Sequence, residues 1–267
     1  MAPLPPERLS IAVPVYRTNL DEREEVSLQS IFRKLGGHHV VLARPEGLDT
    51  EALERRFPFR EVATFDPAFF ASARGYNRLM LSSAFYEAFA RSEYVLVCQL
   101  DVFVFRDDLA GWVDRGYDYV GAPWVSKTAL GDPVHWARMR MRGLLPGRRD
   151  RYHSFELRNR VGNGGFSLRS VASHRRVVAG MASIIDRYLE RHLHEDVFWS
   201  LEPPRREPGW KTPGLEEVLS FAWDINPSRL YRMSGGRLPM AAHGWFRPRR
   251  ADFWSAHVAA ARAAEGW

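Results

Sequence analysis

The chain has 267 residues, enough for one large domain with a substantial core. Its composition, 45% hydrophobic and 26% charged, is ordinary for a globular protein. The single cysteine, Cys98, excludes an internal disulfide and a cysteine-based zinc cluster. The net charge of +6 favours polyanionic partners, namely nucleotide diphosphates, acidic lipid head groups or nucleic acid, although a solvated basic face gives the same value.

The sequence predicts neither a membrane span nor a secretory signal. No segment reaches the roughly 18 consecutive apolar residues of a spanning helix, and residues 1–8 contain three prolines and no apolar run. A lone cysteine inside an apolar stretch indicates a buried thiol and suits a reducing compartment. We therefore expect a cytoplasmic protein.

Strands and helices alternate through the first half of the chain. Short apolar runs predict buried strands over residues 10–16, 39–43 and 60–65. Apolar residues at helical spacing predict helices over 21–35 and 49–56. This alternation is typical of a parallel sheet with crossover helices.

The most strand-like segment of the chain is residues 94–100, and we expect it at the centre of the sheet. A predicted helix over 78–90 precedes it. A helix over 108–115 and a strand over 117–122 follow it.

A basic segment over residues 126–160 interrupts this pattern. It holds eight arginines between Arg138 and Arg160, and Gly143, Pro146 and Gly147 break any helix. We expect an inserted loop whose charge suits a peripheral contact with the acidic inner face of a membrane.

The second half is predicted to continue with a strand over 161–169, a helix over 177–192, a proline-rich loop over 202–214 and a helix over 215–221. We expect the whole chain, 1–267, to form a single domain. Its parts are a nucleotide-binding half (8–125), the basic loop (126–160), an acceptor and catalytic half (161–247) and a tail (248–267).

Asp101 comes directly after the predicted central strand, in the run Gln99-Leu100-Asp101-Val102-Phe103. Ligands of open α/β sheets bind at the carboxyl ends of the strands. A carboxylate there suits a divalent cation that bridges phosphates, whereas an aspartate that only caps the next turn would give the same pattern.

Three glycines in four positions follow in Gly162-Asn163-Gly164-Gly165. They leave room for a close approach of backbone and ligand, and Asn163 adds an amide that both donates and accepts hydrogen bonds. A tight turn or bulge before a strand is the alternative.

Two further motifs contain titratable side chains. In His194-Glu195-Asp196-Val197, a carboxylate at the edge of a packed element has its basicity raised by desolvation, although an acidic first turn of a helix looks the same. His243, beside Gly244, is either a metal ligand or diphosphate donor, or a structural histidine.

In their order along the chain, these motifs resemble an uncharacterised bacterial family of GT-A-type glycosyltransferase-like proteins. The resemblance extends over residues 8–247 and is carried by six stretches: 77–89, 94–105, 117–124, 162–169, 195–199 and 239–245. It implies a GT-A-like (Rossmann-like) α/β domain with a mostly parallel central sheet flanked by helices. It also implies a nucleotide-sugar-dependent transferase.

The resemblance assigns metal binding to Asp101 and His243, with Mn²⁺ or Mg²⁺ as the ion. Asp101 matches the acidic motif at the end of the central strand, and His243 matches a late metal-binding histidine. The usual Asp-x-Asp is incomplete here, because Phe103 stands at its third position and Gln99 lies two residues before Asp101. Metal dependence is therefore an open expectation.

The resemblance also assigns catalytic and donor-binding residues. Asp196 matches the base of inverting members, with Glu195 as its nearest competitor. Gly164 and Gly165 match the loop beneath the donor sugar. The rest of the expected donor-binding set is Gln99, Asp101, Asn163 and Trp245, whose ring suits stacking on a sugar.

The predicted function is transfer of a sugar from a nucleotide donor, such as a UDP-sugar, to a hydroxyl of a glycan or glycolipid, with inversion, in bacterial glycan or glycoconjugate synthesis. No specific nucleic-acid partner is expected, because the arginines cluster without a recognisable binding motif. Two alternatives stay open: a non-catalytic module for polyanions or nucleic acid, and a sugar nucleotidyltransferase. The latter would need a glycine- and lysine-rich loop after the first strand, where Pro14-Val15-Tyr16 stands instead.

Overall fold

The central sheet has six strands, five of which run in the same direction. The computed structural model describes residues 2–125 and 156–267, and within them the strand order is β3-β2-β1-β4-β7-β6. The exception is β7, which runs antiparallel to β4 and β6 on either side of it. The strands are β1 (Leu9–Pro14), β2 (His39–Pro45), β3 (Glu61–Phe65), β4 (Tyr94–Cys98), β6 (Tyr119–Pro123) and β7 (Val161–Ser170). The predicted α/β class with a mostly parallel sheet is confirmed.

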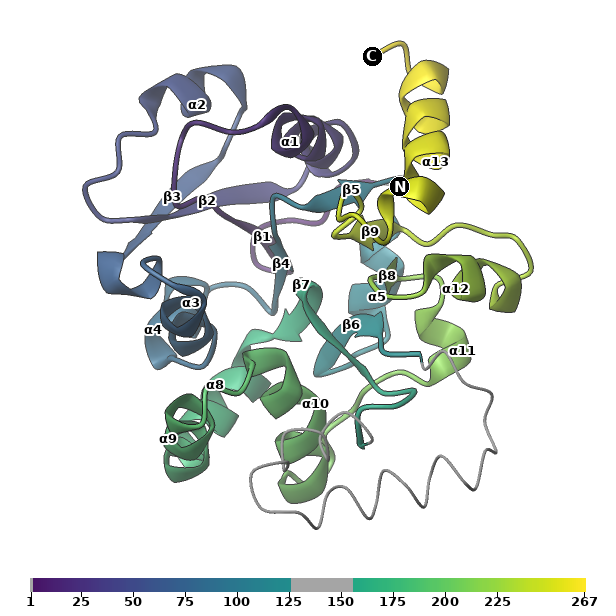
Figure 1. The fold of residues 1–267 in the computed structure, drawn as a ribbon. Coiled ribbons are helices and arrows are strands. Elements are labelled where there is room, and N and C mark those ends of the chain that lie inside the picture. The colour runs from purple at the N-terminus through teal and green to yellow at the C-terminus, as the bar shows by residue number, and fades with distance from the viewer. Residues whose placement is uncertain (1, 126–155) are drawn as a thin grey trace.

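Helices cover both faces of this sheet (Figure 1), because successive strand residues point to opposite sides. Ile11 packs in the core on one face and Ala12 in the core on the other. The first face carries α1 (Glu22–Leu35), α2 (Glu51–Arg56), α5 (Leu109–Asp114) and α11 (Leu215–Val218). The second carries α3 (Ala73–Met80), α4 (Ser83–Ala88), α8 (Val171–Gly180), α9 (Ala182–Glu190) and α10 (Glu195–Arg206).

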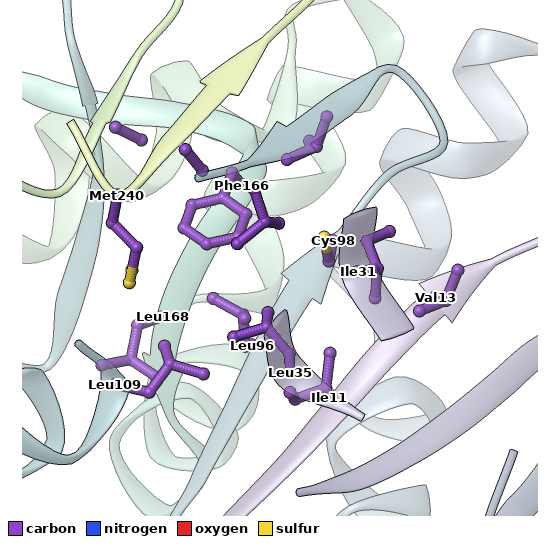
Figure 2. Packing of buried hydrophobic residues seen from close by; sticks show 14 of the residues in the cluster. Ile11, Val13, Ile31, Leu35, Leu96, Cys98, Leu109, Phe166, Leu168 and Met240 are labelled. Atoms are coloured by element: carbon purple, nitrogen blue, oxygen red, sulfur yellow. The ribbon is translucent and has the colours of Figure 1, made fainter. Parts of the chain in front are cut away.

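Figure 2 shows the first of these cores, in which Ile31 and Leu35 of α1 lie against Ile11 and Leu96 of the sheet. Cys98 is fully buried in the same cluster, and burial raises the pKa of its thiol well above the ordinary value. A buried thiol was predicted for this residue, and its burial is confirmed.

A second, three-stranded sheet lies beside the first and has the order β5-β9-β8. Its strands are β5 (Val102–Val104), β8 (Ala222–Trp223) and β9 (Ala241–His243). Phe103, Trp223 and Ala242 pack from this sheet into a third core, to which α13 (Ala251–Ala264) contributes Trp254. Leu230 of α12 (Pro227–Met233) lies in the same core. The small sheet thereby joins the end of the central strand to the last part of the chain.

Several predicted elements differ from the observed ones. The helix expected over 78–90 is two helices, α3 and α4, because Ser82 accepts a hydrogen bond from the Phe85 N–H and starts a new one. The helix expected over 177–192 divides after Gly180. Residues 202–206 of the expected proline-rich loop instead complete α10, which contains Pro203 and Pro204.

Most of the basic loop predicted over 126–160 lies outside the described residues, up to residue 155. Its described end, 156–160, leads directly into β7, as expected. In the two stretches that the structure covers, no helix is both long and apolar enough to cross a membrane.

The start of α1 is fixed by a capping box. The Asp21 carboxylate accepts from the N–H groups of Arg23 (2.8 Å) and Glu24 (3.0 Å), while the Glu24 carboxylate accepts from the Asp21 N–H (2.9 Å). Arg17 holds the same Glu24 carboxylate with two contacts of 2.7 Å. The segment that follows β1 is thus tied to the first turn of α1.

We expect Asp21→Ala to lower the free energy of unfolding by about 0.5–2 kcal/mol, because two helix N–H groups lose their acceptor. Urea denaturation followed by circular dichroism measures this. Asp21→Asn is the matched control and should keep most of the stability, since asparagine caps equally well. Equal losses in both variants would mean that the carboxylate acts by its charge and not as a cap.

Candidate active site

The connections of the sheet diverge between β1 and β4. The chain leaves β1 toward β2 and β3 on one side and then returns to β4 on the other. In open α/β sheets, ligands bind at such a point, beyond the carboxyl ends of the strands. A cavity of about 550 Å³ lies there. Its lining includes Pro14 at the end of β1, Tyr16 beyond it, Tyr76 of α3, Gln99 and Asp101 after β4, and Arg247.

The small sheet brings three polar side chains together at this place. Val102 pairs with His243 across β5 and β9, so Asp101 lies next to His243. Trp223 pairs with Ala242 across β8 and β9, so Asp224 lies on the other side of His243. Asp101 and His243 were predicted to share a site, and strand register places them side by side.

These side chains form a line of alternating charge. The His243 Nε2 lies 3.1 Å from Asp101 Oδ1, and its Nδ1 lies 3.1 Å from Asp224 Oδ1. Arg247 donates to Asp101 Oδ2 (2.8 Å) at one end, and Arg250 pairs with Asp224 at the other. The side chains of His243 and Asp224 are each only 6% exposed, so the centre of the line is screened from water.

The charges in this line shift each other's pKa. Burial lowers the pKa of His243, but Asp101 and Asp224 outweigh it and raise the pKa to about 9. Burial acts to raise the pKa of Asp101, but His243 and Arg247 hold it well below the ordinary value. At neutral pH the site therefore contains an imidazolium between two carboxylates.

Two atoms in this line have no hydrogen-bond partner. Asp101 Oδ1 and His243 Nε2 are both buried, and although they are 3.1 Å apart their geometry does not form a hydrogen bond. Unsatisfied buried polar atoms are rare and call for an explanation such as an ion.

A carboxylate oxygen and an imidazole nitrogen suit Mn²⁺ or Mg²⁺ if phosphate oxygens and water complete the coordination. Across the described residues, no three His, Cys, Asp or Glu side chains form a metal cluster by themselves. The two residues thus fit a metal shared with a phosphate ligand, once the imidazole has lost its proton.

The glycines of β7 make room for side chains of the protein itself. A Cβ at Gly164 would overlap Glu195 Oε1, and a Cβ at Gly165 would overlap His243 Nε2. Asn163, which precedes them, donates to Asp224 Oδ2 (3.0 Å) and accepts from the Gly165 N–H (3.0 Å). The glycines were expected to admit a ligand, and the groups that approach them closely in the structure are the side chains of Glu195 and His243, one on each side of the strand.

Glu195 belongs to a buried ion pair. Both of its oxygens lie 3.1 Å from Arg169 Nη2, and the two side chains are 6% and 0% exposed. Arg169 also donates to the Tyr86 hydroxyl and to Ser167 Oγ, both at 3.0 Å. The negative charge of Glu195 therefore compensates a buried guanidinium. Protonation of Glu195 would remove this compensation, so the residue is poorly suited to act as a proton acceptor.

Asp196 differs from its neighbour in both partners and pKa. Its carboxylate accepts from the Val197 N–H (2.8 Å), and no arginine of the described residues pairs with it. Burial, followed by the charge of Glu195, raises the pKa of Asp196 from 3.8 to about 7. The residue stays partly exposed. A carboxylate with this pKa can accept a proton at neutral pH.

The other predicted donor-binding residues lie in different surroundings. Gln99 lines the cavity, and its N–H donates to the Gly165 carbonyl (2.9 Å). Trp245 is 8% exposed, packs against Phe103 and donates its indole N–H to Ser27 Oγ (2.8 Å). Its position is that of a core residue behind Asp101.

Sequence reasoning missed four charged residues: Asp224, Arg247, Arg250 and Arg169. Asp224 had a signal, because it follows the apolar run Phe221-Ala222-Trp223 just as Asp101 follows its strand. The arginines had none, because 38 lysines and arginines are spread along the chain and only the fold selects these three.

We expect Glu195→Gln to lower the free energy of unfolding by about 3–5 kcal/mol, because it leaves the fully buried Arg169 without a counter-charge. Guanidinium denaturation measures this. The matched control is Glu51→Gln, which breaks the exposed pair with Arg55 and should change stability little. Similar losses in the two variants would contradict the structural role of Glu195.

Asp224→Asn should lower the pKa of His243 from about 9, because one of its two neighbouring carboxylates is removed. A pH titration of the imidazole followed by NMR measures this. Asp107→Asn, which removes the partner of His38 instead, is the control and should leave His243 unchanged. An unaltered His243 titration in Asp224→Asn would show that Asp224 does not act on the imidazole.

Solved structures of glycosyltransferases share this fold. Mouse xyloside xylosyltransferase 1 is 12% identical, with a TM-score of 0.55 over 91% of this chain and 99% of that one. Galactosyltransferase LgtC, solved with donor and acceptor sugar analogues, is 15% identical, with a TM-score of 0.56 over 96% and 95%. GlyE of Streptococcus pneumoniae is 10% identical, with a TM-score of 0.51 over 97% and 64%. At these identities the likeness establishes the GT-A-type fold and nothing finer.

No curated protein sequence matches the chain. One family model does, over residues 60–243, and it carries the description "protein of unknown function (DUF5672)". These residues include β4, the glycine motif, both acidic motifs and His243, and they make up more than half of the chain. The protein therefore belongs to the DUF5672 family.

Proposed function

We propose that this protein is a glycosyltransferase that moves a sugar from a UDP-sugar to a hydroxyl of a glycan or glycolipid. The observation that carries the proposal is the pair of buried atoms Asp101 Oδ1 and His243 Nε2, which face each other at 3.1 Å without a hydrogen bond beside a cavity at the switch point of the sheet. The GT-A-type fold of the solved glycosyltransferases supports it.

The donor lies in the 550 Å³ cavity with its base toward β1 and its diphosphate toward β4. Tyr16 lines this cavity and is 55% exposed, an unusual position for a large aromatic ring and a suitable one for stacking on a base. Arg247 also lines the cavity and is 53% exposed at its side chain, so it can turn from Asp101 to a phosphate.

Asp101 and His243 hold a Mn²⁺ or Mg²⁺ ion in this proposal. When bound, the ion neutralises negative charge on the diphosphate. Asp224 orients His243 through Nδ1, which leaves Nε2 directed at Asp101. Arg250 and Asn163 hold Asp224 in turn.

Asp196 is the proton acceptor for transfer. The acceptor oxygen forms a bond to the anomeric carbon while the bond from that carbon to the diphosphate breaks, and the electron pair leaves with UDP. The acceptor proton passes to the Asp196 carboxylate. A direct displacement of this kind inverts the anomeric configuration.

We expect Asp101→Ala and His243→Ala each to weaken UDP binding in the presence of manganese and to have a smaller effect in its absence. Isothermal titration calorimetry measures the affinities. The control is Asp107→Ala. Asp107 is a partly buried aspartate that also pairs with a histidine, His38, and its variant should bind UDP like the wild type. Unchanged affinity in both site variants would remove the metal from the proposal.

Asp196→Asn should lower transfer by about 10²–10⁴-fold while UDP still binds, because an amide cannot accept the proton. The variant should stay folded at pH 8. The pKa of Asp196 is higher in the folded protein than in the unfolded one, so ionisation of this carboxyl lowers the stability of the wild type as pH rises toward 7. Asparagine does not ionise, so the variant avoids this loss. In the wild type, kcat/KM should rise with pH to a plateau above about 7.

Two results would contradict this mechanism. Near-normal transfer by Asp196→Asn would exclude Asp196 as the base, and a product of retained configuration in the NMR spectrum would exclude direct displacement. Salt-sensitive binding to random DNA without any UDP binding would instead favour a polyanion-binding module.

A further inference from the structure

A second cavity of about 960 Å³ opens next to Asp224. Its wall begins with Ile225 and Asn226, directly after Asp224, and continues along α12 and the start of α13. Arg250 lines it and reaches inward to pair with Asp224. Arg250 thus connects the cavity to Asp224 and, through it, to the line of charged side chains.

The lining of this cavity is strongly basic. It includes Arg229, Arg232, Arg249 and Arg250 and a single acid, Asp252. Arg250 is neutralised by Asp224. Within the described part of the chain, Arg232 and Arg249 make no ion pair, and both are exposed. Guanidinium groups left without carboxylates in a concave site favour a phosphate ligand, which they bind with two parallel hydrogen bonds.

Apolar side chains accompany the arginines. Met233 lines the cavity at 41% exposure and is one of the two exposed large hydrophobic residues of the described chain. Phe253 and Pro227 line it too. An exposed apolar side chain next to unpaired arginines suits a ligand in which a phosphate is attached to a less polar group.

The turn that follows β9 contributes arginines to the lining of both cavities. Arg247 lines the 550 Å³ cavity, called the donor cavity below, and pairs with Asp101. Arg250 lines the 960 Å³ cavity, called the arginine cavity below, and pairs with Asp224. Gly244 lies between them, since a Cβ there would contact both guanidinium side chains. A ligand in the arginine cavity therefore lies beside Arg250 and Asp224, at the end of the charged line opposite to Arg247 and Asp101.

We propose that the arginine cavity binds a phosphate group of the acceptor, so that the acceptor is a phosphate-bearing molecule. The assignment of this phosphate to the acceptor rests on the proposed glycosyltransferase function, whereas the phosphate site itself does not. The shared chemistry is a phosphoester, carried either by a lipid head group at a membrane or by a free sugar or polyol phosphate.

The test uses the full-length protein saturated with UDP, so that the donor cavity is occupied. One arm titrates glycerol 3-phosphate by calorimetry. The other sediments the protein with phosphatidylcholine vesicles that contain or lack phosphatidylglycerol. The variant is Arg232→Ala/Arg249→Ala. The control is Arg175→Ala/Arg191→Ala, which removes the same charge from exposed positions at α8 and α9, away from α12 (Figure 1).

We expect binding in at least one arm and a loss of about tenfold or more in the cavity variant, because each arginine supplies charge-assisted hydrogen bonds to phosphate. The control should change affinity by about twofold at most. Binding only to the anionic vesicles assigns a lipid-borne phosphate, and binding of glycerol 3-phosphate assigns a free one.

Two outcomes would overturn the proposal: no binding of either probe by the wild type, or equal losses in the cavity variant and the control. The affinity of the wild type for UDP reports separately on the donor site. UDP binding without phosphate binding leaves the proposed function intact and removes the arginine cavity. Phosphate binding without UDP binding would support the arginine cavity and contradict the proposed function.

Discussion

The cost of burying Asp224 organises the candidate site. A carboxylate that is 6% exposed must be compensated, because an isolated charge in the protein interior is strongly unfavourable. Asp224 has three partners, Asn163, His243 and Arg250, which come from β7, β9 and the start of α13. Each partner belongs to a different structural layer, so satisfying this one group joins the glycine strand, the small sheet and the last helix.

The small sheet gives this arrangement its geometry. Asp101 is tied to β9 by the hydrogen bond from the Gly244 N–H to its carbonyl (2.8 Å), and β5 and β9 fix His243 beside it. On the far side of β7, Arg169 and Glu195 form a second buried pair that holds the start of α10, where Asp196 lies. Gly164 and Gly165 separate the two clusters by the thickness of a single strand. Asp196 thus lies in the first turn of α10, on the Glu195 side of β7 and outside the charged line.

The sequence predicts the features of the fold that are local. Alternating strands and helices, an acid at the end of the central strand and a glycine-rich strand are all visible as short patterns, and the structure contains each of them. Long-range register is not visible in this way. That Val102 faces His243 and Trp223 faces Ala242 decides which polar residues meet, and it makes Asp224 a partner of His243. For the same reason Trp245, an expected sugar-stacking residue, packs into the core against Phe103.

We propose that a metal ion and a diphosphate complete the surroundings of Asp101 Oδ1 and His243 Nε2, which form an ion pair without a hydrogen bond. Anomalous X-ray scattering from crystals grown with manganese and UDP tests it directly. We expect a manganese peak in contact with Asp101 Oδ1 and His243 Nε2, and UDP in the cavity lined by Tyr16 and Arg247. UDP bound elsewhere, or UDP in this cavity with no manganese peak between the two side chains, would contradict it.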